Sequence, residues 1–164
     1  MTILSYNPTF IDLLKSPVLL LAFGFGSGLS SKAPGTVGSL LGLVIWFFLA
    51  KLSLPVYLVF VAICALVGVY ICGSAAKRLG VHDHGGIVWD EFVGLWVGMA
   101  GLSVSWASLL LGFGLFRLFD IWKPWPISWI DKNISGGLGI MLDDIAAGLA
   151  TAGTIAFLKL LGWL

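Results

Sequence analysis

Long apolar runs separated by short polar stretches dominate the chain. Five runs have the composition of membrane helices, at residues 37–50, 56–76, 87–99, 106–119 and 139–164. A transmembrane helix needs about 20 mostly apolar residues, and turns at 51–55 and 101–105 would join neighbouring runs as hairpins. We therefore predict an all-α fold, a polytopic membrane-embedded helical bundle that forms one domain over residues 1–164, with about five spanning helices.

The N-terminal part of the chain departs from this pattern. Residues 1–16 mix apolar and charged positions, which predicts a short segment on the membrane surface. Residues 17–25 are apolar, but this run is too short to span comfortably. We expect a half-spanning or re-entrant segment there, and full spanning stays open. A loop rich in glycine and hydroxyl groups then leads into the first long apolar run.

The composition favours an integral membrane protein and gives no sign of nucleic-acid binding. Hydrophobic residues make up 59% of the 164 residues and charged residues 10%, whereas soluble domains are usually about 45–50% apolar and about 25% charged. The net charge of +1 provides no basic field for nucleic acid. Bilayer lipid is the expected partner, and the composition leaves the oligomeric state open.

Basic residues fall mostly on one side of the predicted bundle. The loops near residues 30–39, 77–86 and 117–137 share that side. They carry six bases, Lys32, Lys77, Arg78, Arg117, Lys123 and Lys132. Lys51 and Lys159 fall on the opposite side. The positive-inside rule makes the base-rich side cytoplasmic, and the acidic residues described next lie at or just inside that face.

Five acidic residues stand in apolar sequence, where an ionised carboxylate is costly unless it is paired or bound to a cation. They come from three predicted helices: Asp90 and Glu91, Asp120, and Asp143 and Asp144. Carboxylates with phosphate and water suit Mg²⁺, which prefers hard oxygen ligands. We predict that Asp90, Glu91, Asp143 and Asp144 hold the metal, and that Asp120 belongs to the same site. The alternative is that each acid caps a helix start or pairs with a nearby base.

Two bases and one loop are candidates for binding phosphate beside these acids. Arg117 offers a planar fork of donors and Lys123 a point charge, although Arg117 and Asp120 are three residues apart and would also pair with each other. Backbone N–H groups at a helix start attract anions. The loop candidates lie at such a start: Gly35, Thr36 and Ser39. The loop lacks the Gly-Lys-Ser/Thr ending of a Walker loop.

Two further groups of residues allow more than one interpretation. His82, Asp83 and His84 share a polar loop. Asp83 is a substrate-binding candidate, and the His-x-His pair would bind metal, act as a general acid or simply be exposed. Cys72 and Arg78 match the Cys-x5-Arg spacing of cysteine phosphatases, but those enzymes need a thiolate in a loop. We interpret Cys72 as a packing residue because it lies near the end of an apolar run.

Several of these residues fall in motifs that follow one another in a fixed order. The motifs are Gly26-Ser-Gly-Leu29 with Pro34-Gly-Thr-Val-Gly-Ser39, His82-Asp-His-Gly-Gly-Ile-Val-Trp-Asp90-Glu91, Phe116-Arg-Leu-Phe-Asp-Ile-Trp-Lys-Pro-Trp-Pro-Ile127 and Gly137-Leu-Gly-Ile-Met-Leu-Asp-Asp-Ile-Ala-Ala-Gly148. Together they resemble the phosphatidylglycerophosphatase A family of bacterial membrane lipid phosphatases, over residues 22–150. The Lys-Pro-Trp-Pro-Ile and Gly-Ile-Met-Leu-Asp-Asp pieces are specific, whereas the glycine loop alone is not.

The resemblance implies Mg²⁺-dependent hydrolysis of phosphatidylglycerophosphate to phosphatidylglycerol and phosphate, the last step of phosphatidylglycerol synthesis, at the cytoplasmic face of the bacterial inner membrane. The residues expected to carry the chemistry are Asp90, Glu91, Asp143, Asp144, Arg117 and Asp120. The number of ions, the strictness of headgroup choice, and attack by water or by an Asp all stay open.

Two other functions would also use acidic residues in a membrane protein. A small membrane cation transporter would also use intramembrane carboxylates, but transport sites usually lie near the bilayer midplane between repeats, and no repeat is visible in the sequence. A phosphatidyl-group transferase would use acids and Mg²⁺, but its Asp-Gly-x2-Ala-Arg run is absent.

Overall fold

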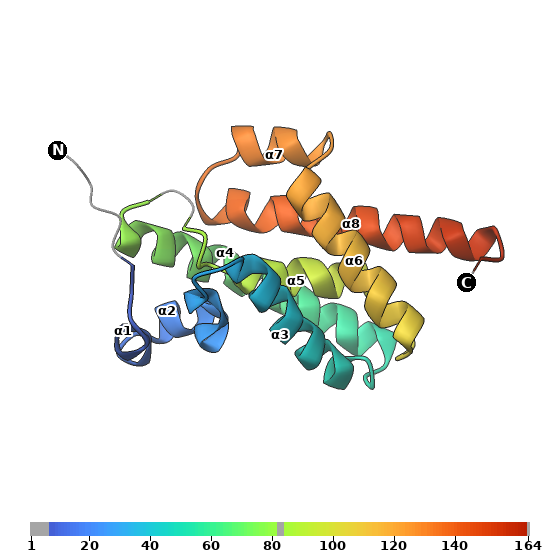
Figure 1. The fold of residues 1–164 in the computed structure, drawn as a ribbon, viewed down its shortest axis with the longest axis horizontal. Helices are drawn as coiled ribbons and strands as arrows, with labels where there is room; N and C mark the ends of the chain where they lie inside the picture. Colours follow the sequence, from blue (N-terminus) through green and yellow to red (C-terminus); the bar gives the residue numbers. More distant parts are fainter. Residues whose placement is uncertain (1–6, 82–83, 164) are drawn as a thin grey trace.

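The computed structural model describes residues 7–81 and 84–163 of the chain. Within these two ranges every regular element is a helix and no strand occurs. The all-α prediction is therefore confirmed. Figure 1 shows the helices arranged as a bundle in which the longest elements run along the long axis of the molecule.

Three short helices form the N-terminal part of the described chain, α1 (Phe10–Leu14), α2 (Pro17–Ala22) and the 3₁₀ helix η1 (Gly24–Leu29). Thr9 caps α1 and Ser16 caps α2 through their side-chain oxygens. At about 1.5 Å per residue, the six residues of α2 are too short to cross a bilayer alone. Gly26, with φ of 104°, lets the chain turn sharply inside η1 instead of continuing as one helix.

Six helices that follow η1 complete the described part of the bundle. They are α3 (Pro34–Leu49), α4 (Leu54–Leu79), α5 (Trp89–Gly98), α6 (Trp106–Trp122), α7 (Ile127–Asn133) and α8 (Gly136–Leu160). The predicted turns at 51–55 and 101–105 fall at the α3–α4 and α5–α6 connections, although α4 already begins at Leu54. The hairpin pattern of the sequence is thus present in the structure.

Two of these helices, α4 and α8, are long and apolar enough to cross a membrane, judged by length and composition. The ten residues of α5 rise only about 15 Å, which is half the hydrocarbon thickness of a bilayer. The described residues therefore contain two candidate membrane spans, and the total of about five spanning helices remains a prediction. Many large apolar side chains are exposed on the outer face of α4, Leu66 with 74% of its surface among them.

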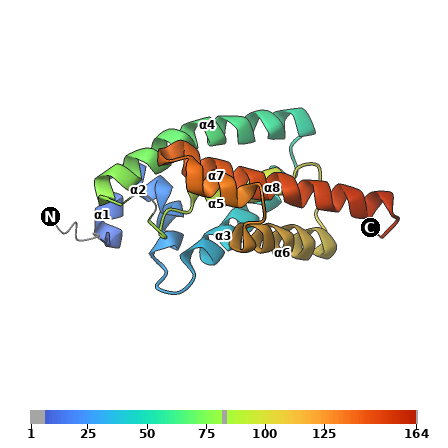
Figure 2. The ribbon, with the colours of Figure 1, turned by 90° about the horizontal axis from the view of Figure 1, so that it is seen from above.

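The short helix α5 is the centre of the bundle, with most of its residues buried. Figures 1 and 2 show it between α4 on one side and α3 and α6 on the other, next to α8. Aromatic donors fix it there: the Trp96 indole donates to the Gly42 carbonyl at 2.9 Å, and the Tyr57 hydroxyl donates to the Trp96 carbonyl at 2.6 Å. Buried indole and phenol groups usually find such partners.

Glycines allow α5 and α8 to approach closely. A Cβ atom on Gly94 would lie 2.6 Å from the Asp144 carbonyl oxygen, and one on Gly148 would lie 2.2 Å from the Gly94 carbonyl oxygen. Neither position accepts a side chain without separating the two helices. Small residues that bring backbones together are typical of membrane helix pairs.

The sequence pattern predicts only that residues 127–138 are polar, but most of this region is helical. It forms the helix α7, and α8 begins at Gly136 rather than at residue 139. α7 forms because its apolar side packs on α8, with Ile127 buried. Asp143 and Asp144 are consequently the eighth and ninth residues of α8, counted from Gly136. A helix-capping role for these two acids is thereby excluded.

Candidate active site

The five acids predicted to meet are brought together by three helices. Asp90 and Glu91 stand in the first turn of α5, Asp120 near the end of α6, and Asp143 and Asp144 in the third turn of α8. Asp144 is only 4% exposed, and the charges of the other four acids all act on it. The close α5–α8 crossing brings four of these acids together, because Gly94 meets the Asp144 backbone and lies one turn from Asp90 and Glu91.

Arg117 connects the acids of α5 and α6. Its Nη1 donates to the Glu91 carboxylate, and it also forms an ion pair of 2.7 Å with Asp120. The Ser39 hydroxyl lies 3.3 Å from the same nitrogen and 2.7 Å from Glu91 Oε2. Arg117 and Asp120 do pair, as the alternative reading allowed, but the pair is part of a larger network that ends at Glu91.

Lys123 connects the acids of α7 and α8. Its Nζ lies 2.6 Å from Asp131 and 2.6 Å from Asp143. Burial alone would lower the pKa of Lys123, but the hydrogen bonds and charges of Asp131 and Asp143 raise it above the ordinary lysine value. Lys123 therefore stays protonated at neutral pH, with its charge directed at the acid cluster.

The glycine-rich loop reaches the same place through the start of α3. A Cβ atom on Gly35 would lie 2.1 Å from Glu91 Oε1, so a glycine is required where the loop meets this carboxylate. Ser39 contacts Glu91 directly. Thr36 is half-buried in the first turn of α3, and no side chain caps that helix start. The loop candidates Gly35 and Ser39 thus touch the acid cluster, with Thr36 between them.

Of the polar-loop candidates, only His84 is described, and its contacts lie outside this cluster. His82 and Asp83 lie outside the described residues. The ring of His84 accepts from the Gly86 N–H at 3.0 Å and lies 3.0 Å from Asn7 Oδ1, against Phe23. These contacts give His84 a structural role in the loop.

Cys72 is a packing residue, as predicted. It is fully buried in the middle of α4, with its Sγ 3.8 Å from Met141 Sδ. A phosphatase thiolate needs an accessible, phosphate-cradling loop, and a buried helical position provides none. The Cys-x5-Arg match to Arg78 is therefore coincidental.

The acid cluster retains binding capacity for a cation. Oδ1 of Asp143 and Oδ2 of Asp144 are buried without a hydrogen-bond partner, and such oxygens are costly unless something binds them. Within 7–81 and 84–163, no group of three His, Cys, Asp or Glu side chains forms a ready-made metal cage. The donor set fits a hard cation that completes its shell with other oxygens.

The comparisons with known proteins point to one family. The family model described as phosphatidylglycerophosphatase A matches residues 20–159. The chain is 48% identical over 146 residues to phosphatidylglycerophosphatase A of Escherichia coli strain K12, which covers 88% of this chain and 85% of the relative.

The chain belongs to the phosphatidylglycerophosphatase A family. The protein of that name in Haemophilus influenzae is also 48% identical, over 145 residues, with 87% of this chain and 89% of the relative covered. A relative in Bacteroides thetaiotaomicron, 37% identical over 151 residues (87% of this chain and 90% of the relative), carries the provisional name of a phosphatidylinositol-3-phosphatase. No solved structure matches the chain. Family membership identifies it as an enzyme of the phosphatase class.

The matched region contains the whole acid cluster and also Asp131, which was absent from the sequence-based candidates. The sequence pattern does not single out Asp131, because residues 127–138 have the polar composition of a connecting segment. The apolar spacing of Ile127, Ile130 and Ile134 is the signal that would have indicated a short helix there.

Proposed function

We propose that this chain is a Mg²⁺-dependent lipid phosphatase that hydrolyses phosphatidylglycerophosphate to phosphatidylglycerol and inorganic phosphate. The observation that carries the proposal is the buried pair Asp143 and Asp144, which offers unpartnered oxygens beside the ammonium group of Lys123. Ionisable groups in apolar surroundings are generally retained for function. The similarity to named phosphatidylglycerophosphatases supports the reaction and the substrate.

Four acids would hold the cation: Asp90, Glu91, Asp143 and Asp144. Mg²⁺ commonly takes one or two carboxylates and fills its remaining positions with water and substrate phosphate. The two unpartnered oxygens, without a closed cage among the described residues, agree with that mode. When bound, Mg²⁺ supplies Lewis-acid polarisation of the phosphoryl oxygens and favours deprotonation of the attacking water.

Arg117 and Lys123 would offset charge on the phosphoryl group. In the structure both bases are held by carboxylates at the edge of the cluster. An entering phosphate competes for the same donors, and Arg gives it a bidentate fork while Lys gives a point charge. Positioning and electrostatics supply most of the catalysis in phosphoryl transfer. Asp131 keeps Lys123 in place when the phosphate draws it away from Asp143.

The start of α3 would hold the remaining phosphate oxygens. Gly35 and Thr36 present backbone N–H groups in the first turn of a helix whose N-terminus has no side-chain cap, and such turns favour anions. Thr36 and Ser39 add hydroxyl groups. Asp83 remains a candidate contact to the headgroup.

The reaction forms a bond from a water oxygen to phosphorus while the bond from phosphorus to the glycerol oxygen breaks. That glycerol oxygen takes a proton and leaves as a hydroxyl of phosphatidylglycerol. Attack by an Asp carboxylate, followed by hydrolysis of an aspartyl phosphate, is the alternative. Rapid acid quenching with a lipid carrying labelled phosphate separates the two routes, because only the second leaves label on the protein.

We further propose a multi-pass arrangement in the bacterial inner membrane, with the site facing the cytoplasm. Trp106 and Trp122 are exposed at opposite ends of α6, about 24 Å apart along the helix. Tryptophans at this separation fit the two interfaces of a bilayer. The greater number of bases on the side of Lys32, Lys123 and Lys132 supports the orientation. Cation transport is not favoured, because the similar proteins are named as phosphatases.

The test is phosphate release by the purified protein from a panel of lipid phosphates, with Mg²⁺ or with EDTA. We expect release from phosphatidylglycerophosphate in Mg²⁺ only. Phosphatidylinositol 3-phosphate belongs in the panel because of the name of the Bacteroides relative. A matched control is Asp12→Asn, which removes a carboxylate in α1, a helix that packs mainly on α2 and η1. Full activity in EDTA would refute the metal dependence, and preference for another headgroup would refute the substrate.

A further inference from the structure

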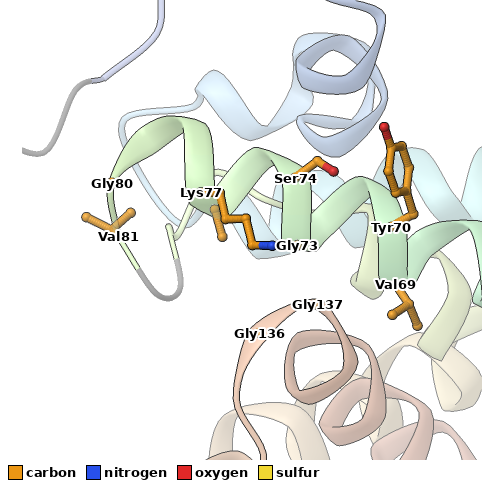
Figure 3. A pocket seen from close by; sticks show the side chains of 10 residues that line it. Val69, Tyr70, Gly73, Ser74, Lys77, Gly80, Val81, Gly136 and Gly137 are labelled. Atoms are coloured by element: carbon orange, nitrogen blue, oxygen red, sulfur yellow. The ribbon is translucent and has the colours of Figure 1, made fainter.

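A groove of about 460 Å³ opens between the C-terminal half of α4 and the start of α8. Figure 3 shows Val69 pointing toward α8 and Lys77 folded back along α4 toward Gly73, with Gly136 and Gly137 on the facing helix. The groove shares no lining residue with the acid cluster. Nothing in the proposed phosphatase chemistry uses it.

Glycine backbone forms the floor of this groove. A Cβ atom on Gly137 would lie 2.0 Å from the Val69 carbonyl oxygen, and one on Gly73 would lie 3.2 Å from the Gly137 nitrogen. The two helices therefore meet without side chains between them. Above the contact, the space that side chains would otherwise fill stays open as the groove.

The polar end of the groove carries a positive charge. Lys77 is exposed in the last turn of α4, and its ammonium group forms no ion pair or hydrogen bond within the described ranges, 7–81 and 84–163. Its neighbour Arg78 is different, since it donates to the Ser16 hydroxyl at 2.7 Å. Ser74 adds a hydroxyl to the lining one helical turn from Lys77.

The other end of the groove is apolar and continues along the outside of α4. Tyr70 is 68% exposed and Leu66 is 74% exposed. Both belong to a helix that is long and apolar enough to cross a membrane. A molecule seated with its charge at Lys77 would therefore have its apolar part beside the surface that faces acyl chains.

We propose that this groove binds one diacyl phospholipid of net negative charge, taken from the surrounding membrane. Its phosphate contacts Lys77 and Ser74, and its acyl chains lie along Tyr70 and Leu66. A soluble anion would match the lysine but not the apolar wall, and a zwitterionic lipid would leave the lysine charge uncompensated. The proposal requires that α4 crosses the membrane, and it is independent of hydrolysis at the acid cluster.

Native mass spectrometry of the protein released from nanodiscs of phosphatidylcholine and phosphatidylserine tests this assignment. Phosphatidylserine is the probe because it is anionic and is neither the proposed substrate nor its product. We expect the wild-type protein to retain phosphatidylserine preferentially. Lys77→Glu should lower that retention by about fivefold or more, because the loss of one lysine charge near an anionic surface gives about fivefold and the new carboxylate repels the lipid. Lys15→Glu, which changes an exposed lysine in the N-terminal region, serves as the matched control and should retain the lipid.

A second variant tests the apolar part of the groove. Ser74→Phe should fill the groove and reduce retention of both lipids. Circular dichroism and the size-exclusion profile establish folding for each variant, so the lipid result stands even if no phosphatase activity is found. Equal phosphatidylserine retention by the wild type and Lys77→Glu would overturn the proposal. An equal loss in Lys15→Glu would overturn it too, because the effect would then be one of overall charge.

Discussion

α8 crosses two neighbouring helices at close range, and only one of the two crossings carries acidic side chains. Toward α4, a Cβ atom on Gly68 would lie 2.7 Å from Met141 Sδ, in wholly apolar surroundings. Toward α5, a Cβ atom on Gly94 would lie 2.6 Å from the backbone of Asp144, beside the carboxylates and Arg117. The α4 crossing also brings backbones together, since a Cβ atom on Gly137 would lie 2.0 Å from the Val69 carbonyl oxygen. The two crossings are therefore similar in closeness and opposite in chemistry.

This difference separates the parts played by glycine and by charge. Membrane helices gain little hydrophobic energy by associating in lipid, so small residues and close backbone contact stabilise the pair. Both crossings of α8 use that device. Among the described residues, only the α5 crossing also holds the unpartnered oxygens of Asp143 and Asp144, and these oxygens add nothing to stability. We infer that close backbone contact at the glycines stabilises the bundle, and that the unpartnered carboxylate oxygens at the α5 crossing serve the proposed reaction.

The largest effect is expected from Arg117→Met. This change leaves Glu91 and Asp120 buried without their cation, and breaking a buried pair in this way costs about 3–5 kcal/mol of unfolding free energy. Activity should fall about 10³-fold, the lower end of the effect of an arginine on phosphoryl transfer. Urea unfolding in detergent and phosphate release measure the two losses. Arg117→Lys restores the charge without the fork, and a fully active Arg117→Lys would contradict the role given to the guanidinium.

Asp144→Asn should reduce activity without weakening the fold. The substitution keeps the shape of the side chain and replaces a buried carboxyl group, only 4% exposed, that lies among other acids. We expect phosphate release to fall about 10²–10³-fold, as for loss of one electrostatic contact in a catalytic site, with an unchanged or higher melting temperature. An active variant with a lowered melting temperature would assign Asp144 to structure rather than to catalysis.

Gly94→Ala and Gly68→Ala test the comparison of the two crossings directly. Gly94→Ala places a methyl group against the Asp144 backbone, and Gly68→Ala places one against the end of the Met141 side chain and the Trp89 ring. Overpacking typically costs about 1–3 kcal/mol, and the cost should be lower at Gly68 because the Met141 side chain can move. Gly94→Ala should also lower the kcat of the folded protein, because it pushes Asp144 away from Glu91. Gly68→Ala should leave kcat unchanged. Equal kcat values for the two variants, measured per folded molecule, would show that the α5 crossing has no special part in the reaction.

The smallest effect is expected from Asp131→Asn. Asp131 is partly exposed, and such ion pairs contribute at most about 1 kcal/mol, which corresponds to roughly a fivefold change in kcat/KM. Lys123 keeps its contact with Asp143 in this variant. Asp131→Glu should restore most of the activity, and Lys132→Gln, which changes the neighbouring exposed residue, should have no effect. A loss as large as that of Asp144→Asn would place Asp131 among the catalytic residues.

The sequence predicts that the acids of different helices meet, but it does not predict where each acid lies within its helix. Hydropathy and hairpin turns correctly place Asp90, Glu91 and Asp144 at neighbouring helices, because topology follows from where apolar runs begin and end. The position of Asp144 inside α8 was not predictable in this way, since the start of that helix depends on how α7 packs on it. The same packing contact brings Asp131 to Lys123.

Hydropathy alone also does not give the number of membrane-spanning helices. An apolar run of about thirteen residues reads as a membrane segment by composition, but α5 is buried on nearly all sides by other helices. Hydropathy does not distinguish burial in protein from burial in lipid. The contacts of Trp96 and Tyr57 that make α5 a core helix become apparent only in three dimensions.

We propose that Asp144 and its neighbours bind the catalytic cation. Thermal unfolding of the protein at increasing Mg²⁺ concentrations tests this assignment. A ligand that binds only the folded state at 100 times its Kd adds about 2.7 kcal/mol, so the melting temperature of the wild-type protein should rise and then saturate. Asp144→Asn should show little or no rise, while Asp12→Asn should behave as wild type. An identical Mg²⁺-dependent rise in the wild type and Asp144→Asn would contradict the assignment of the cation to this cluster.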